Sequence, residues 1–146
     1  MDNPCSEGRG GGTAVIHCDD LSLRPLSIPA VSFFEHLAFR LLGSQSLTVA
    51  IICCPPKTSS SFLSDFTDFF TQLLFFSPSI LLFCDFNIHI DSPKSKFTAD
   101  FLDILNCFSL TQHVNSPTHS HGHILDLVCS TASFTIQNLT NQPHDF

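Results

Sequence analysis

The spacing of apolar residues changes several times along the chain and predicts an alternation of strands and helices. Residues 47–54 (LTVAIICC) are β-branched and almost wholly apolar, as in a strand covered on both faces. Residues 80–84 (ILLFC) form a second, shorter run of this kind. In residues 60–76 and 97–108, apolar side chains recur every three or four positions, which predicts two amphipathic helices. Helices placed between apolar strands indicate a layered α/β domain with a mixed sheet.

Weaker alternation predicts several further strands. They are expected over residues 13–17, 34–42, 125–129 and 134–139, whereas residues 21–29 contain two prolines and are expected to form a loop or an edge. The length of 146 residues suits one domain. We expect residues 1–9 to be a flexible leader and residues 10–146 to form the domain.

Composition sharpens this picture in two ways. The chain is 43% hydrophobic and 13% charged, so it has the material for a buried core. It also has 16 Phe and neither Tyr nor Trp. Several of the Phe residues are adjacent in sequence, and neighbours cannot all face one core. We therefore expect an exposed apolar patch through which the chain could self-associate.

Charge and cysteine content limit the function classes. The net charge is −7 with only 6 Lys and Arg, so no basic face for tight DNA binding is visible. An acidic catalytic pocket that uses a metal ion is compatible with this charge. The seven Cys are odd in number and lack a CxxC spacing, which indicates free thiols in a reducing compartment. We see no signal peptide and no apolar run long enough to span a bilayer, and so expect no membrane and an intracellular location, in the cytoplasm or the nucleus.

The strongest candidate for chemistry is Cys84-Asp85-Phe86-Asn87, directly after a predicted buried strand. Polar groups just beyond a strand end lie where α/β sheets usually bind ligands. In extended backbone, Asp85 and Asn87 would point the same way and Phe86 into the core. Asp85 could then orient and deprotonate a water, and Asn87 could donate to a phosphate oxygen. The alternative is an ordinary turn, for which Asp and Asn are common residues.

Two further features contain acidic or imidazole groups. Asp126 lies inside an otherwise apolar strand, where a carboxylate needs a partner; this is either a His that it orients or a neighbouring loop that it caps. His119, His121 and His123 alternate and would share one face of a strand, so they could bind zinc. Because no fourth ligand is evident, we expect a surface histidine cluster and no metal ligands.

With these residues the sequence resembles the endonuclease domain of fish-type non-LTR retrotransposons, in the exonuclease–endonuclease–phosphatase superfamily. Four motifs in the same order support the resemblance: Ile51 to Pro56, Cys84 to Asp91, Leu110 to His119, and Gly122 to Leu127. It covers most of residues 8–140. It implies a partial two-sheet α/β sandwich and Mg²⁺-dependent hydrolysis of a DNA phosphodiester.

The resemblance also implies roles for individual residues. Asp85 matches the Asp that activates the attacking water, Asn87 the Asn on the scissile phosphate, and Asp126 the Asp that orients a catalytic His. We expect Asn87, Thr118 and His123 to contact the substrate.

Departures from the family pattern predict little or no activity. The metal-binding Glu and the catalytic His have no counterpart here, so we expect a domain that is incomplete at both ends. Cys84 replaces a Gly, and its sulfur is expected to crowd the substrate. Cys53 stands at the position of a Tyr. The alternatives are a remnant of the same fold that binds nucleic acid or protein without cutting, and a zinc-binding protein.

Overall fold

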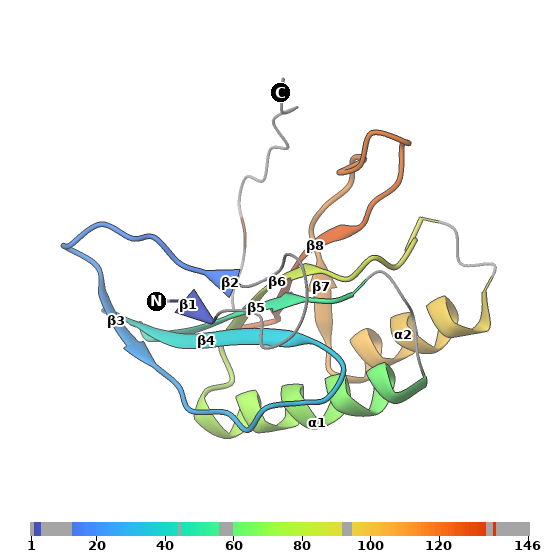
Figure 1. Ribbon diagram of the computed structural model, residues 1–146. Helices are drawn as coiled ribbons and strands as arrows, with labels where there is room; N and C mark the ends of the chain where they lie inside the picture. Colours follow the sequence, from blue (N-terminus) through green and yellow to red (C-terminus); the bar gives the residue numbers. More distant parts are fainter. Residues whose placement is uncertain are drawn as a thin grey trace.

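The computed structural model describes residues 2–3, 13–43, 45–55, 60–91, 95–133 and 136. They form a six-stranded sheet, a separate two-stranded ribbon and two helices (Figure 1). The elements are β1 (Asp2–Asn3), β2 (Thr13–Ala14), β3 (Ser22–Pro25), β4 (Glu35–Leu42), β5 (Leu47–Cys53), α1 (Ser60–Phe76), β6 (Ile80–Asp85), α2 (Lys96–Cys107), β7 (Leu110–Gln112) and β8 (Asp126–Thr131). No helix among these residues has the length and apolarity needed to cross a membrane.

The six-stranded sheet has the order β3-β4-β5-β6-β8-β7. Strands β5 and β6 pair in parallel, connected by α1, and all other neighbouring pairs are antiparallel. The predicted mixed sheet is thus confirmed, with its one parallel pair at the centre. This arrangement brings the carboxyl ends of β5 and β6 beside the start of β8.

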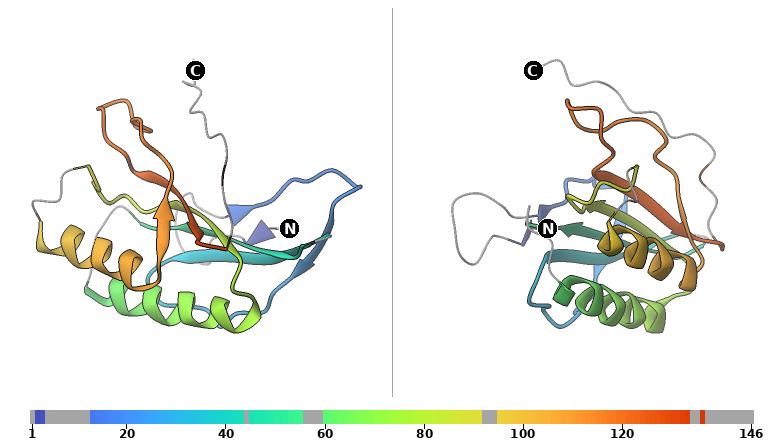
Figure 2. Two further views of the ribbon diagram at one scale, coloured as in Figure 1. Left: turned by 180° about the vertical axis from the view of Figure 1, so that it is seen from behind. Right: turned by 90° about the vertical axis from the view of Figure 1, so that its right-hand side faces the viewer.

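Both helices cover the same face of the sheet (Figure 2). The core between the two layers is dominated by phenylalanine. Phe62, Phe66, Phe69 and Phe70 of α1 and Phe101 of α2 are at most 1% exposed. They pack against the side chains of β5, β6 and β8 that point to this face, among them Ala50, Ile52, Leu82, Leu127 and Cys129.

The expectation that adjacent phenylalanines cannot share the core is wrong for Phe69 and Phe70. Both are fully buried because their rings pack against different neighbours, Phe69 against Phe34 before β4 and Phe70 against Phe108 at the end of α2. It is correct for Phe75, which is 85% exposed near the end of α1.

On the opposite face of the sheet, the described residues form no helix. The β1–β2 ribbon lies here, and contacts β4 and β5. Beyond the ribbon, Ile51 and Val128 are half-buried and Phe83 is 38% exposed. The α/β class and a reduced two-sheet arrangement therefore agree with the prediction.

Strand boundaries differ from the prediction at both edges of the sheet. Residues 22–25 form the edge strand β3 despite Pro25, as an edge strand allows. Strand β7 follows α2 after a turn through Ser109, whose φ is 54°, and was not predicted as a strand. The predicted strand 134–139 lies outside the described residues except for residue 136.

Candidate functional site

Two carboxylates face each other where two central strands meet. Asp85 is the last residue of β6, Asp126 is the first of β8, and the two are direct partners across the strands. Cys53 pairs with Asp85 on the other side of β6. Glu35 pairs in turn with Cys53. Because direct partners in a sheet point to the same face, these four side chains form a row across four strands.

The row lies on the face without helices. Cys84 and Leu127, the chain neighbours of the two aspartates, belong to the buried core, so Asp85 and Asp126 point away from it. A shallow depression of about 390 Å³ opens above them, lined by Thr13, Ile51, Cys53, Phe83 and Val128 among others. The site is thus an acidic pair at the edge of an open apolar surface.

Burial and like charge perturb Asp85. The carboxyl is half-buried, and burial raises its pKa, as does the negative charge of Asp126. The backbone N–H of Asn87 donates to Asp85 and partly offsets both effects. Asp126 is exposed at the start of β8 and not buried within an apolar strand as expected. Like charges directly opposite each other on a sheet destabilise it, which a bound cation would relieve.

Asn87 does not continue the strand. Its φ is 52°, in the left-handed region that Asn tolerates, so the predicted extended backbone through this residue is wrong. Its side-chain amide donates to the Cys54 carbonyl at 3.0 Å, which joins the end of β5 to the turn after β6. Phe86 is 2% exposed among the rings of Phe62, Phe66 and Phe101, as predicted. The two interpretations of this segment, a turn and a catalytic site, therefore do not exclude each other, because Asp85 ends the strand and Asn87 lies in the turn after it.

The cysteines near the site are neutral thiols. Burial raises the pKa of Cys53, with smaller contributions from the charges of Asp85 and Glu35. Burial also raises the pKa of Cys84 well above its usual range, and that of Cys129 to about 12. A protonated thiol is a poor metal ligand and a poor nucleophile. Cys84 is 5% exposed and belongs to the core on the helix-covered face, and the expectation that its sulfur crowds the substrate stays a prediction.

Thr118 connects the loop before β8 to the site. Its hydroxyl oxygen accepts hydrogen bonds from the backbone N–H groups of Leu125 and Asp126, both at 3.0 Å. A turn at Gly122, whose φ is 81°, folds the loop back on itself, and the His123 carbonyl accepts from the N–H groups of Thr118 and His119. Thr118 thereby sets where Asp126 enters the sheet. Its predicted contact with substrate stays a prediction.

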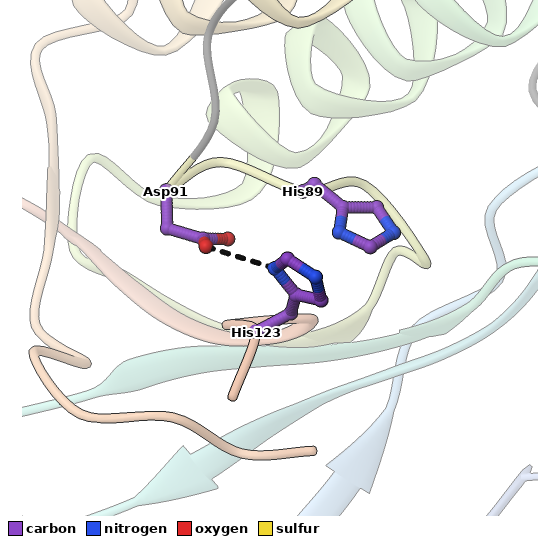
Figure 3. Close-up of side chains that lie close together, drawn as sticks. All are labelled: His89, Asp91 and His123. Carbon is purple, nitrogen blue, oxygen red and sulfur yellow. Dashed lines mark hydrogen bonds and ion pairs between the residues drawn. The ribbon is translucent and has the colours of Figure 1, made fainter. Parts of the chain in front are cut away.

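The three alternating histidines separate in the structure. His119 and His121 stack with ring centroids 4.9 Å apart. His123 instead places its Nδ1 3.0 Å from the Asp91 carboxylate, and its ring lies edge-on to that of His89, with centroids 4.2 Å apart (Figure 3). A carboxylate–histidine pair is thus formed by Asp91 and His123, and the role expected for Asp126, to orient a catalytic histidine, stays a prediction.

Sequence reasoning missed the grouping of His89, Asp91 and His123. Each offers a potential metal-ligand atom, and these atoms all lie within 4.8 Å of one another. The alternating pattern His89-Ile90-Asp91 is visible in the sequence. The third member of the group, His123, lies 32 residues after Asp91 and could not be linked to it from the sequence. Within the described part of the chain this is the one such group of three, and Asp85 and Asp126 gather no third ligand.

Replacing Asp85 with asparagine is expected to raise the free energy of unfolding at pH 7 by about 0.5 kcal/mol, a small effect because solvent screens the half-exposed carboxylate. Asparagine still accepts from the Asn87 N–H but has no charge. A carboxyl whose pKa is raised by folding destabilises the protein as pH rises through that pKa, and costs nothing below its ordinary value of 3.8. The gain should therefore disappear on acidification.

Urea unfolding at a series of pH values measures this effect, with Asp68→Asn, an exposed carboxylate of α1, as the matched control. A loss of stability in Asp85→Asn at neutral pH would show that the charge itself supports the fold.

The similarity of this chain to one solved structure supports the fold. No protein-family model and no curated protein sequence matches the chain. Among solved structures, it is similar to the endonuclease domain of TRAS1, a telomere-specific non-LTR retrotransposon, with a TM-score of 0.64 and 10% identity over 78% of this chain and 55% of that one. A 3′ phosphatase, NExo from Neisseria, bound to a product DNA hairpin, aligns with a TM-score of 0.43 and 14% identity over 66% of this chain and 52% of that one. The chain thus spans about half the length of these structures, and it has the fold of a non-LTR retrotransposon endonuclease domain.

Proposed function

We propose that this chain belongs to a divalent-metal-dependent DNA endonuclease of the retrotransposon type and supplies part of its catalytic site. The observation that carries the proposal is the direct pairing of Asp85 and Asp126 at the ends of two central strands, on the open face of this fold. The TRAS1 domain with the same fold is an endonuclease. The remaining residues assigned to the site, Asn87, Thr118 and His123, lie in the loops that flank this pair.

The acidic pair fits a Mg²⁺ ion. Mg²⁺ is commonly bound by one or two carboxylates together with substrate phosphates, and Asp85 and Asp126 would provide those carboxylates. Burial raises the pKa of Asp85 most, the charge of Asp126 adds to it, and a bound cation would relieve the repulsion between the two carboxylates. A bound Mg²⁺ would polarise the phosphate. An oxygen of Asp85 that does not bind the ion would be suited to accept a proton from water, and the amide of Asn87 to donate to a phosphate oxygen once released from Cys54.

The site in the described residues is not a full catalytic set, and we propose that the chain does not nick DNA unaided. Among the described residues no third ligand joins the two carboxylates, and the adjacent Cys53 is a neutral thiol, so Mg²⁺ would depend on the substrate phosphate to complete its site. Glu35 lies in the same row, but β5 separates it from Asp85. The net charge of −7 further weakens contact with DNA phosphates.

A binding module of the same fold is the second candidate. It is favoured by the apolar side chains beside the carboxylates, where Phe83 is 38% exposed. Such a surface suits a protein partner or a second copy of the chain. A cytoplasmic or nuclear location is part of both proposals, since the six described cysteines are all free.

Plasmid nicking combined with DNA binding tests the proposal. The wild type, Asp85→Ala and the control Asp103→Ala, an exposed residue of α2, are incubated with supercoiled DNA and Mg²⁺. Binding of a labelled duplex is followed by fluorescence anisotropy with and without Mg²⁺. We expect no nicking by any variant, and Mg²⁺-dependent binding that Asp85→Ala loses and Asp103→Ala keeps, because Asp85 would help to hold the Mg²⁺ through which phosphate is bound.

Two results would contradict this. Nicking by the wild type but not by Asp85→Ala would confirm the role of Asp85 and refute the incomplete site. Folded wild type that neither nicks DNA nor binds it in a Mg²⁺-dependent way would refute the DNA-directed function and favour the binding module.

A further inference from the structure

Three metal-ligating side chains converge from two loops at one end of the sheet (Figure 3). His89 and Asp91 follow β6, and His123 lies in the loop that precedes β8. None of them is part of the Asp85–Asp126 pair. Their potential ligand atoms all lie within 4.8 Å of one another.

The distances are close to those of a coordination sphere. Zinc is bound by imidazole nitrogen and carboxylate oxygen at about 2.0–2.2 Å, so ligands of a tetrahedral ion are separated by roughly 3.4 Å. The Nδ1 of His123 and the Oδ2 of Asp91 are 3.0 Å apart. The imidazole of His89 lies beside that of His123, with centroids 4.2 Å apart. Small side-chain rotations therefore suffice to place one ion between the three groups.

The backbone holds these side chains in place without a metal. The second oxygen of Asp91 accepts from the N–H of Ile124 at 3.3 Å, which fixes the carboxylate against the His123 loop. Ile88, next to His89, is 3% exposed in the core. The N–H of Phe86 donates to the Leu125 carbonyl and joins the two loops just behind the cluster. Such supporting hydrogen bonds orient the ligands of protein metal sites.

An ion pair between Asp91 and His123 does not account for the whole arrangement. The hydrogen bond from His123 lowers the pKa of Asp91, but both side chains are accessible to solvent, and exposed pairs stabilise a fold little. It also gives no reason for a second imidazole at the same place. Two nitrogens and one oxygen suit zinc-like transition metals, whereas Mg²⁺ prefers oxygen ligands alone.

We infer that His89, Asp91 and His123 bind a divalent transition-metal ion of the zinc type, with one coordination position open to solvent. Bound there, the ion joins the segment after β6 to the loop before β8. It thereby holds together the two loops that flank Asp85 and Asp126.

Metal content and affinity test the inference. The full chain is stripped with a chelator, dialysed against Zn²⁺ and analysed by mass spectrometry of the metal, and affinity is measured by competition with a chromophoric chelator. We expect one zinc ion per chain, and a weakening of about tenfold or more in His89→Ala and in Asp91→Ala. Because His89 and Asp91 are exposed, both variants should remain folded.

His121→Ala is the matched control, since this exposed histidine of the same loop stacks on His119 and lies outside the cluster. It should bind zinc like the wild type. Zinc should raise the melting temperature of the wild type and of His121→Ala, but not that of His89→Ala. Co²⁺ substitution should give a spectrum without a thiolate charge-transfer band, which separates this site from binding by the exposed Cys18 or Cys107.

Several outcomes would overturn the inference. They are wild type that folds but takes up no zinc at micromolar concentrations, His89→Ala that binds as tightly as wild type, a loss of binding in His121→Ala, and a thiolate band in the Co²⁺ spectrum. None of these outcomes depends on whether the chain nicks DNA.

Discussion

Phe62→Ala should lower the free energy of unfolding by about 3–5 kcal/mol, the usual cost of removing a fully buried phenyl ring. Phe62 is 1% exposed on α1. Its ring lies 5.6–5.9 Å, centroid to centroid, from those of Phe33, Phe34, Phe66, Phe86, Phe97 and Phe101. These neighbours come from the segment before β4, from α1, from the turn after β6 and from α2. The cavity would therefore loosen four parts of the fold at once.

Urea denaturation followed by circular dichroism measures this loss. Phe75→Ala is the matched control, because Phe75 lies on the same helix and is 85% exposed. It should change the stability by less than about 0.5 kcal/mol. A similar cost for both variants would show that burial in α1 is not as described.

Thr118→Val should lower stability by about 1–2 kcal/mol, since it removes the shared acceptor of two backbone N–H groups and keeps the shape of the side chain. The N–H groups of Leu125 and Asp126 both donate to the Thr118 hydroxyl oxygen. Without it, they have to be rehydrated, which opens the loop before β8 and the first residue of the strand. Hydrogen exchange should therefore become faster at Leu125 and Asp126, and stay slow at buried Cys129.

Thr111→Val is the matched control, because Thr111 is an exposed strand residue of β7. It should be neutral or slightly stabilising, since a β-branched apolar residue suits a strand. Unchanged exchange at Leu125 in Thr118→Val would contradict the role of Thr118 in positioning Asp126.

The sequence was most informative where one periodicity ran over many residues. The spacing in residues 60–76 predicted α1 with its observed bounds, and the apolar runs predicted β5 and β6 to within one residue. The prediction that Asp85 lies at the end of a strand required only the apolar run of β6. These features depend on local patterns, in which burial repeats with the period of the element.

Features that depend on distant partners could not be read in the same way. The short strand β7 is specified by its pairing with β8 rather than by its own pattern. The left-handed backbone of Asn87 follows from the hydrogen bond to Cys54 on another strand. His123 looked like one of three alternating histidines, but the turn at Gly122 directs it to Asp91. In each case, contacts with a distant part of the chain select one of several conformations that the local sequence allows equally well.

The parallel pairing at the centre of the sheet also has a consequence for the order of assembly. Strands β3, β4 and β5 form a meander of neighbours in sequence, whereas β6 finds its partners only across α1 and, later, across α2 and β7. Contacts between residues distant in sequence form slowly, because the chain loses conformational entropy before the strand pairing provides any stabilising free energy. During synthesis the meander and α1 emerge first, and β6 has one open edge until β8 is complete. The nascent chain is therefore most exposed to misassociation in the interval between the synthesis of β6 and that of β8.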